Sequence, residues 1–378
     1  MSGFFYFKQT FINLYNHNYI LKMTKKHKSA LSVKKGVKEV NSLNEKSVSK
    51  FKQIKKNTKS VEEYVNGIKN GEITVLSQAI TLIESSKKEY FEKAQEIISE
   101  CLPFSGNSVR IGITGVPGVG KSTFIETFGM HLLDKGKKIA VLAIDPSSER
   151  SGGSILGDKT RMEKLSAEKN AFIRPSPSAG SLGGVARKTA ETIILCEAAG
   201  FDTIFIETVG VGQSETVVNS MVDFFMLLML AGAGDELQGI KRGITEIADL
   251  IVINKADSDN IKNATRAQAE YQNALHLFPP SESGRNPKVV TASAENGSGI
   301  SEIADLLEDY FLFTKKNNYF YERRSKQAKF RMYETINEEL KNRFYSDKKI
   351  SNKLKEFEQD VLAGKISPYA AAQILLDN

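Results

Sequence analysis

The sequence has no long hydrophobic stretch, and this absence limits the classes of protein to consider. No apolar run approaches the roughly 20 residues that a membrane-spanning helix requires. The composition, 40% hydrophobic and 26% charged, is ordinary for a globular protein. We therefore expect a soluble protein with no membrane partner. A chain of 378 residues exceeds the roughly 250 to 300 residues of a single core, so we expect one large domain with two arms.

Cysteine and histidine are both scarce. Cys101 and Cys196 are the two cysteines of the chain, and no C-x-x-C or Cys/His spacing surrounds them. The four histidines are scattered along the sequence. These absences exclude a disulfide framework and a zinc site, and they are compatible with a reducing compartment.

Acidic residues are missing from the first 38 positions, which hold eight lysines, and Glu39 is the first carboxylate. The whole chain has 52 basic and 45 acidic residues, so without those eight lysines the remainder is nearly balanced. The basic character belongs to a tail and gives no support to a nucleic-acid-binding face. We expect residues 1–55 to be a disordered basic tail, since they lack the arginines and the long apolar core of import signals.

Helical periodicity begins after this tail. Between residues 61 and 102, apolar side chains recur three and four positions apart in two sets, with Gly67 and Gly71 between them. This pattern predicts a helical hairpin that packs on the main domain, within an N-terminal arm of residues 56–105. Beyond residue 314 the sequence is again helical and highly charged, which predicts a C-terminal helical arm over 315–378.

Residues 106–314 alternate short β-type runs with helical segments. This alternation predicts an α/β domain with a mostly parallel sheet flanked by helices. The expected strands are 109–114, 138–145, 201–207, 224–230, 250–254 and 288–292.

The strongest motif lies between Gly115 and Ser122, which read G-V-P-G-V-G-K-S and match the phosphate-binding P-loop. An apolar strand precedes the motif and a helix follows it, as the P-loop requires. The glycines let backbone N–H groups face phosphates at a helix N-terminus, Lys121 neutralises phosphate oxygens, and Ser122 ligates Mg²⁺. The expected phosphate-binding residues are Gly115, Gly118, Val119, Gly120, Lys121, Ser122 and Thr123.

A base-reading motif, N-K-A-D, places Asn254, Lys255 and Asp257 directly after the fifth expected strand. This is the carboxyl end of a strand, where open α/β sheets bind ligands. The Asp257 carboxylate can accept two hydrogen bonds from guanine that adenine does not offer, and such sites discriminate strongly. Ser293 and Ala294 follow the next strand and could back the base edge. We therefore expect GTP rather than ATP.

Residues that sense the γ-phosphate should lie between these motifs. Glu207 ends an expected strand and is the first residue of the stretch E-T-V-G. The last residue of this stretch, Gly210, can offer its N–H to the γ-phosphate. Lys121, Glu207 and Gly210 are the candidate catalytic residues. Asp145 and Asp158 add two carboxylates for the metal, although each could instead cap a helix. Mg²⁺ needs only one or two carboxylates beside phosphate oxygens.

The sequence does not single out a side chain that assists hydrolysis. Candidates to position water are Gln213 and Gln238. Candidates to stabilise transition-state charge, as an arginine finger does, are Arg150, Arg161, Arg174 and Arg187.

Together these blocks resemble the MeaB family, known in animals as the methylmalonic aciduria type A protein, within the metal-binding and signal-recognition class of GTPases. The stretches that carry the resemblance are G-V-P-G-V-G-K-S-T, A-I-D-P-S-S, G-D-K-T-R-M, I-E-T-V-G-V-G-Q-S-E, A-G-A-G-D-E-L-Q-G-I-K-R-G-I and N-K-A-D. It covers residues 60–378. In the family pattern the Mg²⁺ ligands fall on Ser122, Asp145, Asp158 and Glu207.

The resemblance implies a GTPase chaperone, slow without its partner, that gates adenosylcobalamin loading into methylmalonyl-CoA mutase or a related acyl-CoA mutase and protects it. A cobalamin adenosyltransferase is a further candidate partner. Residues 231–243 look like an additional switch, with Asp235, Gln238 and Lys241 as candidate signalling residues. The resemblance also implies Mg²⁺ and GTP or GDP as ligands, with no tightly bound organic cofactor.

Family members are homodimers in which the C-terminal arm supplies contacts. We infer that Ile336, Leu340, Ile374 and Leu375 serve that interface. We expect a location in the bacterial cytoplasm, or in the mitochondrial matrix if the chain is eukaryotic.

Two other functions compete with this interpretation. A kinase or ATPase of basic amino-acid transport would need adenine binding, against which N-K-A-D argues. A metal-delivery GTPase of the nickel or cobalamin-maturation type would share the P-loop, but such proteins usually carry His-rich or Cys-containing motifs, which this sequence lacks.

Overall fold

A computed structural model describes residues 59–85, 87–145, 162–177, 182–208, 214–232 and 242–377. The described residues belong to one compact unit that begins at Lys59. The tail expected at 1–55 lies outside them. Within the described residues, no helix combines the length and apolar character needed to cross a membrane.

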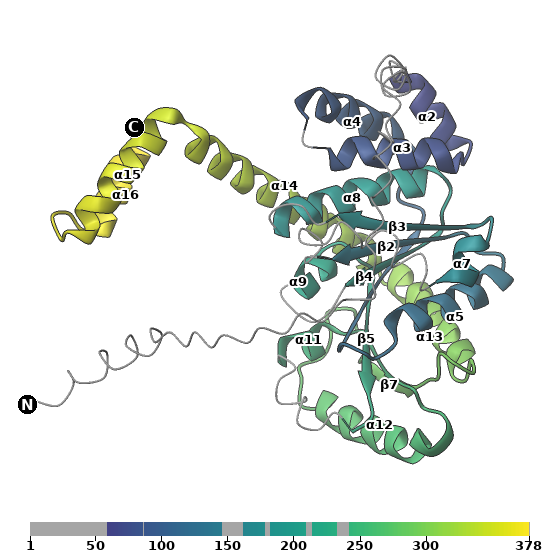
Figure 1. The fold of residues 1–378 in the computed structure, drawn as a ribbon. Helices are drawn as coiled ribbons and strands as arrows, with labels where there is room; N and C mark the ends of the chain where they lie inside the picture. Colours follow the sequence, from purple (N-terminus) through teal and green to yellow (C-terminus); the bar gives the residue numbers. More distant parts are fainter. Residues whose placement is uncertain are drawn as a thin grey trace, which may run out of the picture. The chain divides into compact units, whose positions relative to one another are not determined.

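A seven-stranded parallel sheet forms the centre of this unit, which confirms the expected fold class (Figure 1). Its strands are β1 (Val109–Gly115), β2 (Ile139–Asp145), β3 (Ala171–Pro177), β4 (Thr203–Thr208), β5 (Phe224–Leu230), β6 (Leu250–Asn254) and β7 (Lys288–Thr291). They are ordered β3-β2-β4-β1-β5-β6-β7, and every neighbouring pair is parallel. β4 is buried along its whole length, because helices cover both faces of a parallel sheet.

The sheet contains one strand that sequence periodicity did not predict. β3 reads A-F-I-R-P-S-P and holds Pro175 and Pro177, residues that normally argue against a strand. It pairs only with β2, at the edge of the sheet. A proline is tolerated there because an edge strand has one side free of ladder partners.

Helices lie on both faces of the sheet. They are α5 (Lys121–Asp134), α7 (Glu163–Ala167), α8 (Leu182–Ala198), α9 (Ser214–Asn219), α11 (Arg242–Ile247), α12 (Ile261–Leu275) and α13 (Ile300–Lys316). α5 and α13 pack together on one face, and α8 and α9 pack together on the other (Figure 1). Phe124 and Phe128 of α5 are fully buried against the sheet.

The N-terminal arm contains three helices, so the expected hairpin of two is wrong. These are α2 (Val61–Lys69), α3 (Ile73–Glu84) and α4 (Lys88–Cys101), followed by the short 3₁₀ helix η1 (Leu102–Phe104). Gly71 has φ of +74° and marks the first break. Gly67 lies inside α2, where a Cβ would come within 2.9 Å of Val75, so it permits close helix packing instead of ending a helix. The expected contact with the main domain is present, since α3 and α4 pack on α8.

The amino ends of three strands share one device. An aspartate directly before a strand accepts a hydrogen bond from a backbone N–H at the start of a neighbouring strand. The three cases are Asp202 Oδ2 with Lys138 N at 3.0 Å, Asp223 Oδ2 with Arg110 N at 2.8 Å and Asp249 Oδ2 with Phe225 N at 2.9 Å. These hydrogen bonds satisfy backbone N–H groups that have no partner in the sheet.

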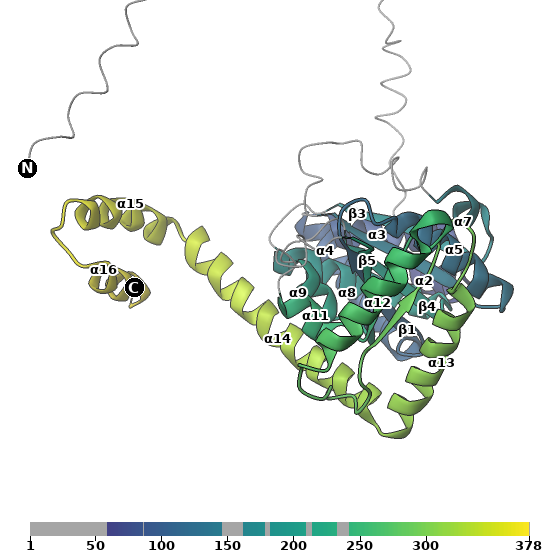
Figure 2. The same cartoon turned by 90° about the horizontal axis from the view of Figure 1, so that it is seen from below.

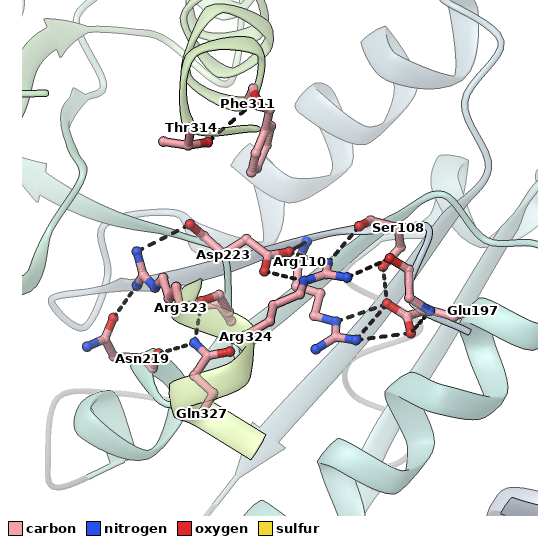
Figure 3. A network of polar contacts seen from close by, with 12 residues as sticks. Ser108, Arg110, Glu197, Asn219, Asp223, Phe311, Thr314, Arg323, Arg324 and Gln327 are labelled. Carbon is pink, nitrogen blue, oxygen red and sulfur yellow. Dashed lines mark hydrogen bonds and ion pairs between the residues drawn. The ribbon is translucent and has the colours of Figure 1, made fainter. Parts of the chain in front are cut away.

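Two of these aspartates are covered by the long helix α14 (Tyr319–Ser346). Arg324 binds Asp223 with two hydrogen bonds of 2.7 and 2.6 Å (Figure 3). Arg323 lies 3.3 Å from Asp249. Both carboxylates are almost completely buried. Burial raises the pKa of Asp249 even though Arg323 opposes the shift. The two arginines therefore hold the start of α14 on the amino edge of the sheet.

A third arginine extends the same network. Arg110 of β1 forms two hydrogen bonds with Glu197 of α8, at 2.9 and 3.0 Å. Burial alone would raise the pKa of Glu197, but the charge and hydrogen bonds of Arg110, together with the hydrogen bonds from Ser108 and Gly106, hold that pKa below its ordinary value.

Beyond this network α14 leads to a pair of helices, α15 (Lys348–Leu362) and α16 (Pro368–Leu376) (Figure 2). Asp347 and Ser367 cap their N-termini with hydrogen bonds to backbone N–H groups. α16 packs on α15 and buries Leu375. The interface role expected for Leu375 is therefore wrong, because this side chain serves the packing of the arm itself.

We expect Arg324→Met to lower the free energy of unfolding by about 3 kcal/mol, since it leaves the Asp223 charge buried without its partner. Denaturant unfolding of the whole chain would measure this. The matched control is Arg343→Met, which removes an exposed pair with Glu339 and should change stability by less than about 0.5 kcal/mol. A loss for Arg324→Met no larger than that of the control would contradict the assigned role.

Candidate functional site

The carboxyl ends of β1, β4 and β6 bring the predicted motifs to one edge of the sheet. β1 is the central strand and leads into the P-loop, with β4 on one side and β5 on the other. Gly115 ends β1, and Lys121 begins α5. A Cβ at Gly115 would lie 2.4 Å from the carbonyl oxygen of Leu228 on β5, so only glycine allows the two backbones to pass this closely.

The P-loop is a tight turn built on glycines. Gly118 and Gly120 have φ of +77° and +89°, in the left-handed region that other residues avoid. The Lys121 ammonium donates hydrogen bonds to the carbonyl oxygens of Gly115 at 2.9 Å and Val116 at 3.4 Å. Its side chain thus folds back over the loop that should hold the phosphates.

Lys121 lies in an environment that opposes its charge. Burial lowers the pKa of its ammonium, whereas Glu207 and Glu215 act in the other direction. A phosphate close to Lys121 would supply the negative charge that restores a high pKa.

Ser122 and Glu207 meet beside the P-loop. The Ser122 hydroxyl donates to the Glu207 carboxylate over 3.3 Å, so two of the predicted metal ligands are adjacent. Hydroxyl and carboxylate oxygens are ligands that Mg²⁺ accepts, so this donor pair fits that ion. Next to them Thr114 and Thr208 share a hydrogen bond of 2.7 Å that joins the ends of β1 and β4.

Three further predicted residues of the site are Asp145, Asp158 and Gly210. Asp145 ends β2 at the same edge of the sheet, but its side chain is outside the description. Asp158 and Gly210 also lie outside the described residues. Among the side chains that are described, no group of three or more His, Cys, Asp or Glu could hold a metal ion.

Two residues of N-K-A-D bind the P-loop directly. Asn254 donates to the carbonyl oxygen of Val119 at 2.8 Å and accepts from the backbone N–H of Ala294 at 3.2 Å. Lys255 adopts φ of +59° and donates to the carbonyl oxygen of Gly118 at 2.9 Å. The base-reading loop and the phosphate-binding loop are therefore fixed to each other.

The remaining members of the predicted base site also come together. Asp257 accepts a hydrogen bond from the hydroxyl of Ser293, which is buried. Thr127 of α5, which the motifs did not identify, donates a hydrogen bond to the carbonyl oxygen of Ala294 at 2.6 Å. This bond attaches the 293–294 loop to α5. Only the chain topology reveals this residue, because no motif places α5 beside that loop.

Two of the four candidate arginines have other roles. Arg174 of β3 pairs with Glu84 of α3, and Arg187 of α8 lies 3.2 Å from Glu191. Arg187 also stacks on Phe91 of α4 at 4.8 Å from the ring centre. Both therefore attach the N-terminal helices to the main domain in this structure.

Several predicted residues fall outside the described part of the chain. These are the remaining candidates for assisting hydrolysis and the three candidates for partner signalling: Arg150, Arg161, Gln213, Asp235, Gln238 and Lys241.

A family model described as methylmalonyl Co-A mutase-associated GTPase MeaB matches residues 76–349. Among curated relatives, a Mycobacterium tuberculosis protein named as a probable GTPase is 48% identical over 318 residues, covering 84% of this chain and 95% of its own length. The Mus musculus protein named methylmalonic aciduria type A homolog, mitochondrial, is 45% identical over 331 residues. The match covers 85% of this chain and 80% of the length of the mouse protein.

Two further matches carry a different name. The Escherichia coli GTPase ArgK is 49% identical over 254 residues, covering 67% of this chain and 77% of its own. A crystal structure titled LAO/AO transport system kinase superposes with a TM-score of 0.69 at 36% identity, covering 84% of this chain and 96% of that one.

We expect Asp257→Asn to weaken GTP binding by about 100-fold, because an amide cannot accept both hydrogen bonds from the guanine edge. The same amide can donate to the extra carbonyl of xanthine, so xanthosine triphosphate should bind better than to the unaltered protein. Displacement of a fluorescent guanine nucleotide would measure both affinities. Asp259→Asn, two residues along and exposed, is the control. Unchanged GTP affinity in Asp257→Asn would remove Asp257 from the base site.

Proposed function

Since the chain belongs to the MeaB family of methylmalonyl-CoA mutase-associated GTPases, we propose that its GTP hydrolysis serves as a chaperone cycle for an adenosylcobalamin-dependent acyl-CoA mutase. In this proposal the protein gates loading of the cofactor into the mutase and protects the mutase from inactivation. Methylmalonyl-CoA mutase is the proposed partner, with a cobalamin adenosyltransferase as a further one.

The observation that carries the nucleotide part of the proposal is the double link between the base-reading and phosphate-binding loops. Asn254 and Lys255 hold Val119 and Gly118 by hydrogen bonds of 2.8 and 2.9 Å. A nucleotide spans the distance between these loops with its base, sugar and phosphates. Loops that are already joined lose little conformational freedom on binding, which favours affinity.

The roles of the residues follow from their positions. The backbone N–H groups of 115–123 would surround the phosphates, and Lys121 would leave the carbonyl oxygens of Gly115 and Val116 to bind them. Ser122, Glu207, Asp145 and Asp158 would hold Mg²⁺. Bound there, the ion would neutralise phosphate charge. Asp257 would accept hydrogen bonds from guanine, while Ser293 fixes its carboxylate.

We propose that the segment between β5 and α11 transmits the nucleotide state to the partner. β5 runs beside the strand that leads to the P-loop, and α11 begins at Arg242. Asp235, Gln238 and Lys241 connect the two and are the proposed signalling residues.

The name LAO/AO transport system kinase belongs to the structural relative and raises one alternative function. A kinase or ATPase of basic amino-acid transport would prefer ATP. Adenine does not offer the pair of N–H donors from which the Asp257 carboxylate would accept hydrogen bonds, so the proposed base site favours GTP. A metal-delivery GTPase is a second alternative.

We expect the purified protein to hydrolyse GTP slowly and the acyl-CoA mutase of the same organism to accelerate it by about tenfold or more, as partner-supplied groups do in other GTPases. Phosphate release should be measured with and without the mutase, and ATP should be tested in parallel. Lys121→Ala, which removes the phosphate-binding ammonium, is the inactive control.

The possible results separate the parts of the proposal. Acceleration of GTP turnover alone supports the chaperone function. Steady GTP hydrolysis that the mutase does not change would refute the partner, and a preference for ATP would refute the base site.

We further propose a homodimer formed through the C-terminal arm. α14 exposes Ile336 and Leu340 at 45% and 60%, and α16 exposes Ile374 at 42%. Large apolar side chains that remain exposed along one arm are typical of a surface that a partner covers.

The dimer is best tested by substitution, because a truncation near residue 320 would also remove Arg323 and Arg324 from their buried aspartates. We expect the double variant Ile336→Asp, Leu340→Asp to be monomeric by light scattering at concentrations where the unaltered protein is dimeric. Leu277→Asp, at an 81% exposed position after α12, is the control. A double variant that stays dimeric would exclude this face of α14.

A further inference from the structure

A cavity lies away from the nucleotide loops, between α8, α9 and α14. Its volume is about 550 Å³, within the range of roughly 300 to 1,000 Å³ typical of small-molecule sites. Apolar side chains form most of its wall: Ala190, Ile193 and Ile194 from α8, Val217 from α9, Met221 just after α9 and Phe330 from α14.

Arg331 of α14 supplies a charged group in the wall of this cavity. Its guanidinium donates one hydrogen bond, to the carbonyl oxygen of Ser220 at 3.2 Å, although a guanidinium carries five donors. Burial lowers the pKa of Arg331, and the nearby charges of Arg110 and Arg324 lower it further, while Asp223 and Glu197 act in the other direction.

The neighbouring carboxylates are already bound by other arginines. Glu197 accepts two hydrogen bonds from Arg110, and Asp223 accepts two from Arg324 (Figure 3). Within the described part of the chain, Arg331 takes part in none of the ion pairs found around it. Among the described residues, no carboxylate forms an ion pair with Arg331, whose guanidinium lies at the cavity wall.

Three glutamates also line the cavity, and none of them pairs with Arg331. Glu191 is bound by Arg187 and by the amide of Gln95. Glu334 and Glu338 lie on α14 three and seven positions beyond Arg331, and Glu334 is exposed. Glu338 lies about two helical turns from Arg331, so its charge would repel an anion at that end of the cavity, whereas Glu334 is a neighbour of Arg331 on the helix and is screened by solvent.

We propose that this cavity binds a small amphipathic carboxylate, such as a medium-chain fatty acid, with its carboxylate on Arg331 and its hydrocarbon chain against α8 and α9. A guanidinium binds a carboxylate through two parallel hydrogen bonds. The apolar wall accounts for the hydrocarbon part, since inorganic phosphate or a nucleotide would leave the partly exposed Ile194, Val217 and Phe330 without a matching surface. This inference does not depend on the nucleotide site or on the mutase.

Calorimetric titration of the full chain with decanoate tests the proposal, with decanamide as the uncharged probe of equal length. Decanoate should bind at least about tenfold more tightly than decanamide, because a hydrogen bond to a charged group contributes more than a neutral one. This comparison uses the unaltered protein. Failure of decanoate to bind, or equal binding of the two probes, would overturn the proposal.

A variant then locates the site. Arg331→Met keeps an unbranched apolar side chain and should weaken decanoate binding by at least about tenfold, whereas the exposed control Arg343→Met should not change it. Thermal unfolding should show that Arg331→Met remains folded, since it loses a single hydrogen bond. Decanoate affinity that is unaffected by Arg331→Met would place the ligand elsewhere and refute the assignment.

Dimerisation provides the last check. If decanoate binds the monomeric Ile336→Asp, Leu340→Asp variant but not the dimer, a second copy of the chain covers the cavity and the proposal is wrong. Equal affinity in both states supports a ligand site within one chain.

Discussion

The parallel direction of all seven strands determines where each kind of chemistry can lie in this molecule. Every strand presents its carboxyl end at one edge of the sheet and its amino end at the other. At the carboxyl edge, the ends of β4 and β6 hold Glu207 and Asn254, and the loop after β1 leads to Lys121 at the start of α5. At the amino edge, N–H groups at the strand starts need acceptors, and aspartates supply them. Two of those aspartates, Asp223 and Asp249, are buried and pair with arginines of α14.

Much of the fold was predictable because the signals were local. Six strands were recognisable as apolar runs, and the P-loop and N-K-A-D fell at strand ends, where their chemistry requires them. β3 escaped prediction because Pro175 and Pro177 are compatible with a strand only at a sheet edge, and sequence alone does not reveal which strand is at the edge. The N-terminal arm was predicted with one helix too few, because no glycine or proline marks the break between α3 and α4 after Glu84.

The candidate site, like the fold, was predictable from the sequence only in part. The residues that should contact nucleotide were found from motifs, whereas those that hold the loops in place depend on tertiary structure. Thr127 is separated from Ala294 by 167 positions, and no sequence pattern links them. Arg174 and Arg187 were candidates for catalysis by residue type alone, and their pairing with Glu84 and Glu191 is a property of the packed structure. One signal was available but not used: an aspartate directly precedes β4, β5 and β6.

Arg323 and Arg324 are adjacent in sequence, so their side chains leave α14 about 100° apart and reach two different strands. A rotation of the helix about its own axis would break one ion pair or the other. The two ion pairs therefore fix both the position and the rotation of the first turns of α14 relative to the sheet. About 22 residues separate these ion pairs from the end of α14, roughly 33 Å at 1.5 Å per residue. A tilt of about 5° at the ion pairs would move the far end by about 3 Å, so a small shift between β5 and β6 would become a displacement of α15 and α16 that a bound partner could detect.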